Sequence, residues 1–207
     1  GIDPAPVVGI VGMLDHMDAP IASCFTRGGD IVTLLGGLLP GFQNEELPQR
    51  FGSSQYAKTV LVQTWGLPPS LDFEYEASVQ EATRNIVRQG LANSAHDIGS
   101  GGLAVALAEC CFGPRQVGAT IDFETDHPLL YTMFHESPSR VLLSVPREKL
   151  GEVVAIAAAQ SVPLVELGHT GGSTLSFGLN SKTFVEAPVA HLRKIWESSF
   201  EASLESQ

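Results

Sequence analysis

SAHDIGSGGLAVALAE, residues 94–109, is the stretch that decides the predicted fold of this chain. A short extended run ends at His96-Asp97, a turn containing three glycines follows, and an alanine-rich helix begins at once. Glycine permits positive φ and lets bare backbone approach a neighbour closely. The first N–H groups of a helix lack internal partners, and the helix dipole favours negative charge there. The turn is therefore a candidate cradle for a phosphate or carboxylate, although an ordinary tight turn explains the same residues.

The bulk composition describes an ordinary globular protein. The 207 residues suffice for one large domain, or for one domain plus a piece of another. Hydrophobic residues make up 43% and charged residues 17%, and neither a membrane helix nor a signal peptide is recognisable. The formal net charge of -11 argues against nucleic acid or an anionic membrane as a partner. We expect a cytoplasmic protein, and local backbone N–H groups could still hold a small phosphorylated ligand.

The cysteines suit neither a disulfide framework nor a zinc site. The chain has three, Cys24, Cys110 and Cys111, and two of them are adjacent. Reduced thiols of a cytosolic protein are the better interpretation. Cys110 and Cys111 fall in the helix after the glycine turn, where we expect them to be buried packing residues.

Runs of apolar and β-branched residues predict the strands. These runs are 7–14, 30–35, 117–123 and 141–145. Segments 164–167 and 174–177 are expected to form a hairpin around the GHTGG turn at 168–172, which makes His169 a turn residue before a ligand contact.

Helical periodicity and capping residues predict the helices. The predicted helices are 55–63 after the Gly52-Ser53-Ser54 cap, one from Asp72 to a stop at Gly90, then 102–112, 128–134, 146–160 and 189–204. The second of these buries Val79, Ala82, Ile86 and Val87 on one stripe. Segment 38–50 has the mixed composition of a surface loop. Strands and helices mix without strict alternation, so the expected fold is α+β, a mixed sheet with helices packed on it.

Several stretches together resemble phosphoribosylformylglycinamidine synthase, a synthetase of purine biosynthesis within the aminoimidazole-ribotide-synthetase-like superfamily. The matching stretches, in chain order, are PAPVVG at 4–9, GDIVTLLG at 29–36, GSSQY at 52–56, HDIGSGGLA at 96–104, ESPSR at 136–140 and the final helix with Trp196. The family versions read PTPVVG, GD, GGSEY, HDVSDGGLA and ESQSR. The matches keep their order and span nearly the whole chain.

The resemblance implies a piece of a longer enzyme. Residues 1–27 correspond to the end of a preceding subdomain, and residues 28–207 to a C-terminal domain of the layered α/β type. The parent enzyme uses ATP and magnesium to phosphorylate the formamide oxygen of formylglycinamide ribonucleotide, and ammonia from a glutaminase subunit or domain then displaces phosphate. The family's GNVS stretch, which binds ATP and metal, is expected upstream of this chain together with the catalytic residues. We therefore expect the isolated piece to be inactive, with no catalytic or metal-binding residue of its own.

Two departures from the family pattern affect the expected site. Gly99-Ser100 replaces the family's Ser-Asp, so the turn loses an acid and gains flexibility. Pro138 replaces a glutamine, which removes an amide and a backbone N–H. Both changes favour a non-catalytic, auxiliary nucleotide site in this half of the enzyme.

The candidate residues of that nucleotide or phosphate site come from the two central motifs. They are His96, Asp97, Gly99, Ser100, Gly101, Gly102, Glu136, Ser137 and Arg140.

For several of these residues a purely structural role is an alternative. Asp97 can cap the turn while His96 bonds inside it, and Arg140 can either hold a phosphate or pair with Glu136. Four histidines outside the set carry less signal. His127 and His135 are expected to be solvated, and His16 and His191 carry no signal. The stripe that contains Trp196 is expected to pack against the domain.

Other functions stay open at this stage. A second enzyme class comprises other superfamily members, namely the ribotide cyclo-ligase, selenophosphate synthetase and the hydrogenase maturation carbamoyl dehydratase, whose glycine turns match less well. A third possibility is a non-catalytic nucleotide-binding or scaffold domain, favoured by Gly99, Ser100 and Pro138.

Overall fold

The computed structural model describes residues 20–39, 47–63 and 65–205, together with Gly9, Val11 and Met13. Its centre is a seven-stranded sheet in the order β2-β4-β1-β5-β3-β6-β7. The strands are β1 Ile31–Leu35, β2 Ser94–Asp97, β3 Ala119–Phe123, β4 Val141–Val145, β5 Leu164–Thr170, β6 Thr174–Leu179 and β7 Lys182–Pro188. Neighbours pair antiparallel except β3 and β6, which are parallel. The expected mixed α+β sheet is confirmed.

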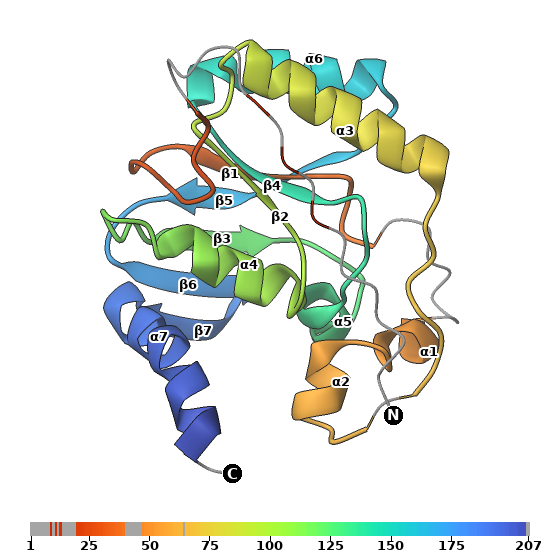
Figure 1. The fold of residues 1–207 in the computed structure, drawn as a ribbon. Coiled ribbons are helices and arrows are strands. Elements are labelled where there is room, and N and C mark those ends of the chain that lie inside the picture. The colour runs from red at the N-terminus through yellow and green to blue at the C-terminus, as the bar shows by residue number, and fades with distance from the viewer. Residues whose placement is uncertain are drawn as a thin grey trace.

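Helices cover the two faces of the sheet unequally (Figure 1). On one face lie α4 Gly102–Cys111, α5 Leu129–Phe134 and α7 Val189–Glu205, and on the other α3 Phe73–Arg88 and α6 Leu150–Ala159. Two apolar clusters follow from this layering, one between the sheet and α4, the other between β1, β4 and the α3–α6 pair. The remaining helices are α1 Leu47–Phe51, α2 Gln55–Thr59 and the short 3-10 turn η1 Arg147–Lys149.

The glycine turn lies on the α4 side of this sheet. β2 is an edge strand that pairs with β4, and the chain turns directly from its end into α4. Leu103, Leu107 and Cys110 are buried on one face of α4, as the helical spacing predicts. Cys111 is buried too, and all three cysteines are free thiols. Burial raises the pKa of the Cys111 thiol to about 12, which keeps it protonated and unreactive.

The α3 helix also follows its sequence signals. The Asp72 carboxylate accepts hydrogen bonds from the N–H groups of Glu74 and Tyr75, both at 3.0 Å. Val79, Ala82 and Ile86 are buried on the stripe facing α6, and Val87 is half-buried at its edge. Gly90 follows the helix with φ of 64°.

The predicted hairpin of 164–167 with 174–177 is wrong. Strand β3 lies between β5 and β6, so the two segments do not pair with each other. The hairpin in the structure joins β6 to β7. Strand β7 was not predicted, because its charged residues Lys182 and Glu186 interrupt the apolar pattern that was used to locate strands. His169 is therefore a strand residue of β5 and not a turn residue.

Other boundaries differ because short-range signals do not show where packing stops an element. Helix α2 ends at Thr59 and not at 63, and α1 occupies the end of the expected loop 38–50. The helix expected over 146–160 divides into η1 and α6.

Two expectations at the chain ends need comment. Most of the expected strand 7–14 lies outside the described residues, and Val11 and Met13 within it are exposed and assigned to no strand. The final helix forms as expected, but only Val189 of its stripe is buried, while Ile195 and Phe200 point outward, 54% and 72% exposed. None of the helices in the described part of the chain is long and apolar enough to cross a membrane.

Candidate functional site

The glycine turn binds a carboxylate of the protein itself. The Gly101 N–H, at the start of α4, donates to Oε1 of Glu136 at 2.8 Å, and the Gly102 N–H donates to the Gly99 carbonyl at 3.1 Å. Gly101 and Gly102 have φ of 84° and 65°, a region that a side chain disfavours. A Cβ on Gly102 would also lie 2.8 Å from the carbonyl oxygens of Met133 and His135. The anion that the turn was predicted to hold is thus supplied by the loop after α5.

Glu136 reaches a second backbone donor. The same Oε1 accepts from the N–H of Gln55, at the start of α2, also at 2.8 Å. Residues 55, 101 and 136 are far apart in the sequence, and this one carboxylate joins the three segments. Carboxylate acceptors at helix starts stabilise by combining a charge-assisted hydrogen bond with the helix dipole.

Arg140 forms no ion pair with Glu136, so that expectation is wrong, while phosphate binding by Arg140 stays a prediction. The residue is 2% exposed, and its guanidinium donates to three backbone carbonyls: Ser137 at 3.2 Å, Leu38 at 3.1 Å and His135 at 2.6 Å. Burial lowers the pKa of Arg140 to about 10, with the nearby charge of Glu136 opposing the shift. Arg140 remains a cation at neutral pH and fixes the 135–140 loop against the end of β1.

His135 is buried, contrary to the expectation of a solvated side chain. It is 1% exposed, and its Nδ1 lies 2.8 Å from the hydroxyl of Ser137, itself a buried member of the candidate set. Burial, followed by the charges of Arg140 and Arg50, lowers the pKa of His135 to about 4. This imidazole is therefore neutral at physiological pH.

His96 bonds outside the turn and not within it. Its Nδ1 lies 3.0 Å from the Ser23 carbonyl oxygen, and its Nε2 lies 3.3 Å from a carboxylate oxygen of Glu109 on α4. Glu109 also accepts from the Trp196 indole at 3.3 Å, and the Trp196 ring packs on Phe112. Trp196 thus packs against the domain as expected, although it is half-exposed.

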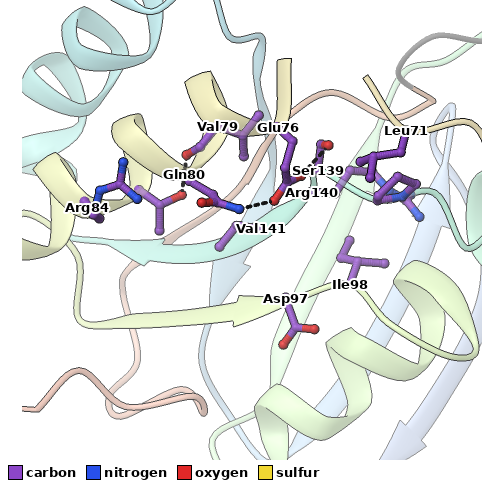
Figure 2. Close-up of a pocket in the computed structure, with 12 residues that line it drawn as sticks. Leu71, Glu76, Val79, Gln80, Arg84, Asp97, Ile98, Ser139, Arg140 and Val141 are labelled. Atoms are coloured by element: carbon purple, nitrogen blue, oxygen red, sulfur yellow. Dashed lines mark hydrogen bonds between the residues drawn. The ribbon is translucent and has the colours of Figure 1, made fainter. Parts of the chain in front are cut away.

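Part of the candidate set lies beside a groove of about 580 Å³ between α3 and the ends of β2 and β4 (Figure 2). The lining residues are Leu71, Glu76, Val79, Gln80, Thr83, Arg84, Asp97, Ile98, Pro138, Ser139, Arg140 and Val141. Glu76, Gln80 and Arg84 come from α3, while Asp97 lies on the opposite side of the groove (Figure 2). Glu76 accepts from the Gln80 amide at 2.6 Å and from the Ser139 hydroxyl at 2.5 Å. Asp97 is exposed and makes no hydrogen bond to the turn among the described residues, so its expected capping role is wrong.

The candidate set is therefore only partly brought together. Asp97 and Arg140 line the groove, whereas Gly101 and Glu136 bind each other outside its lining and Ser100 is an exposed turn residue. The α3 wall was missed. Its polar residues Glu76, Gln80, Thr83 and Arg84 recur at positions i, i+4, i+7 and i+8, so the helical period that located the buried stripe could also have located this one.

A second hollow, of about 550 Å³, is polar and lies elsewhere on the sheet. It is lined by Thr120, His169, Gly171, Gly172, Ser173, Thr174, Ser176 and Glu186. The sheet register aligns His169, Thr120, Ser176 and Glu186 in one row across β5, β3, β6 and β7. Within residues 20–39, 47–63 and 65–205, no three His, Cys, Asp or Glu side chains gather closely enough to hold a metal ion.

Comparison with known proteins agrees with this architecture. Residues 27–178 match the family model described as "AIR synthase related protein, C-terminal domain". The chain belongs to this family. Among curated relatives, it is 37% identical over 213 residues to "Phosphoribosylformylglycinamidine synthase subunit PurL" of Anaeromyxobacter sp. (strain Fw109-5), and 35% identical over 198 residues to the protein of that name from Moorella thermoacetica. These alignments cover 99% and 96% of the chain but 26% of each relative, so the chain spans about a quarter of their length.

Solved structures of Thermotoga maritima PurL share the fold. The structure "T. maritima PurL complexed with FGAR" superposes with a TM-score of 0.69 at 21% identity, covering 84% of this chain and 29% of that one. The structure "T. maritima PurL complexed with ATP" gives a TM-score of 0.64 at 19% identity, covering 84% and 27%. The mixed seven-stranded sheet with its helices is therefore the fold of this family.

Proposed function

We propose that this chain is part of a phosphoribosylformylglycinamidine synthase, the ATP- and glutamine-dependent ligase of purine biosynthesis. The observation that carries the proposal is the similarity to PurL proteins, at 37% identity across 99% of the chain. The order of the motifs from residue 29 to residue 140, which is the order of the family pattern, also supports it. The family match beginning at residue 27 supports a domain boundary near residue 28.

In the proposed reaction, ATP phosphorylates the formamide oxygen of formylglycinamide ribonucleotide, and ammonia displaces phosphate to form the amidine. We assign ATP, magnesium and the glutaminase partner to the longer cytoplasmic enzyme and not to these residues. Among the described residues, no three acidic, histidine or cysteine side chains gather into a metal-binding cluster. No step of the reaction is assigned to a side chain of this chain.

The role proposed for this part of the enzyme is structural. The polar atoms of Glu136, Ser137 and Arg140 form hydrogen bonds within the chain, and these bonds join the glycine turn, α2 and the 135–140 loop. Because these atoms already have partners, the hydrogen bonds support a structural role for motifs that could otherwise bind a ligand.

The test is to compare this chain with the protein encoded by its complete native gene. ATP-dependent amidine formation is expected from the longer protein with a glutaminase or with ammonia, and none from the 207 residues. An open reading frame that encodes no synthetase sequence upstream, or amidine formation by this chain alone, would refute the proposal.

A nucleotide bound in the groove between α3 and β2 is a second candidate function. The volume of about 580 Å³ suits a small ligand. Arg84 supplies a half-exposed cation on its wall, although its guanidinium also pairs with Glu81 at 2.6 Å. Of the nine candidate residues, Asp97 and Arg140 lie on the groove lining, where they would face the bound nucleotide. Calorimetric titration with ADP and magnesium tests this, with Arg84→Gln expected to weaken binding and Arg88→Gln, outside the lining, to leave it unchanged. Absence of heat at millimolar ADP would leave the structural role alone.

A further inference from the structure

The segment joining α2 to α3 presents apolar side chains to solvent. We call these side chains the connector surface. Its members are Val60, Leu61, Val62, Trp65, Leu67, Leu71 and Phe73, and their exposed fractions run from 43% to 83%. No charged residue occurs from position 59 to position 71. Several exposed large apolar side chains in one short segment are unusual for a monomeric protein, and a lack of charged residues is typical of the core of an interface.

Backbone hydrogen bonds hold this segment in place. The Trp65 N–H donates to the Gly52 carbonyl at 3.1 Å, and the Leu67 N–H donates to the Gln49 carbonyl at 3.0 Å. The Arg50 guanidinium donates to the Pro68 carbonyl at 2.9 Å. The course of the segment is therefore fixed against α1 and α2. The Trp65 ring lies against Gly52, between these two helices, and is still 43% exposed.

Val62 lies where the chain leaves α2. Its φ is 53°, in the left-handed region that a β-branched residue strongly disfavours. The N–H of the next residue, Gln63, donates to the Ala57 carbonyl at 3.0 Å, a bond of the type that closes a helix end across one left-handed residue. This bond holds the backbone of Val62 in place while its side chain stays 83% exposed.

We propose that the connector surface is where the part of the longer protein outside these 207 residues docks. The relatives place about three quarters of their length outside the matched region, which supplies a covalently linked partner of ample size. Leu71 belongs both to the connector surface and to the groove lining. The docked part therefore also forms the missing outer wall of that groove. The proposal rests on the proposed function only in requiring a longer chain.

The direct test is carbene footprinting of the longer protein, read by mass spectrometry. The labelling of each residue is divided by its labelling in the same protein unfolded in urea. Trp65 and Phe73 should be protected at least tenfold, while Val154, 46% exposed on α6, should be protected no more than threefold. Equal, weak protection at all three positions would overturn the proposal.

A matched pair of variants separates docking from local stability. Asparagine tolerates positive φ, so Val62→Asn relieves the backbone strain while removing the apolar contact. In the longer protein this variant should lower the protection of Trp65 and Phe73 at least threefold, whereas Val154→Asn should not. Unchanged protection in Val62→Asn would contradict the proposal.

Two further readouts identify the occupant and keep this inference distinct from the proposed function. Protection that falls on dilution, together with a dimer in sedimentation, would assign the surface to a second copy and refute docking within one chain. Amidine formation is measured on the same samples. An active enzyme with an unprotected connector surface would refute only the docking, and an inactive protein with a protected surface would refute only the proposed function.

Discussion

The buried imidazole of His135 should make the protein lose stability in mild acid. Burial, with Arg140 and Arg50 nearby, lowers its pKa to about 4 from an ordinary value of 6.5. The unfolded chain then binds a proton that the folded protein does not bind between these pH values. The contribution of this group is fully present above about pH 6.5 and is lost as the pH falls toward 4. At pH 5 the loss amounts to about 2 kcal/mol of unfolding free energy, and a folded-state pKa one unit higher would still leave about 1.6 kcal/mol.

His135→Asn isolates this effect from the titration of the carboxylates. Asparagine places a polar group near the position of Nδ1, where it can keep the 2.8 Å contact with the Ser137 hydroxyl, and it does not titrate. Urea unfolding at pH 8 and pH 5 gives the stability difference for each protein. The wild type should lose about 2 kcal/mol more than the variant between these pH values.

The control is His191→Asn, an exposed position on α7, which should follow the wild-type pH dependence. Equal losses for the wild type and His135→Asn would refute the argument, because they would show that the imidazole of the folded protein accepts a proton as readily as that of the unfolded chain.

Three further predictions concern the turn, the helices and the thiols. Glu136→Ala should cost about 2 kcal/mol in urea unfolding, because two N–H groups lose their charged acceptor, and an unchanged midpoint would show that water replaces it. Gly102→Ala should destabilise by more than 1 kcal/mol because its Cβ meets two carbonyl oxygens, whereas Gly151→Ala in α6, with open space around it, should stabilise by about 0.5–1 kcal/mol; calorimetric melting of both variants tests the opposite signs. Iodoacetamide should alkylate Cys24 in the native protein and spare buried Cys111, whose pKa is about 12, and equal alkylation would contradict the burial.

Local patterns predicted most of the elements, because each has a short-range cause. The Asp72 cap, the apolar stripe of α3 and the glycine after it define one helix without reference to the rest of the chain. Strand order has no such cause. Segments 164–167 and 174–177 look like a hairpin because a glycine turn joins them, yet β3, forty residues earlier, inserts between them. Pairing that depends on distant segments is invisible to periodicity.

The site shows the same limit more sharply. Sequence reasoning found the glycine turn and the ESPSR loop and assigned both to an external anion, because each carries groups that bind one. It could not show that the two satisfy each other. Glu136 lies 35 residues beyond Gly101 and 81 beyond Gln55, and only the packing of α5 against α4 brings its carboxylate to both N–H groups. A buried polar group needs a partner, and a partner within the chain serves as well as a ligand.

The hydrogen bond from Gly101 to Glu136 also bears on Gly99-Ser100, the pair that replaces Ser-Asp of the family pattern. An aspartate at position 100, as in the related family pattern, would bring a second negative charge to the turn whose Gly101 N–H binds Glu136. The family pattern combines that aspartate with the glutamate of its ESQSR stretch, whereas this chain has exposed Ser100 in the turn and keeps Glu136. The replacement therefore removes a charge from the turn without removing the carboxylate that accepts from the Gly101 N–H. The hydrogen bond to the Glu136 carboxylate depends on the left-handed backbone at Gly101 and Gly102, so the fold itself requires these glycines whether or not a ligand binds.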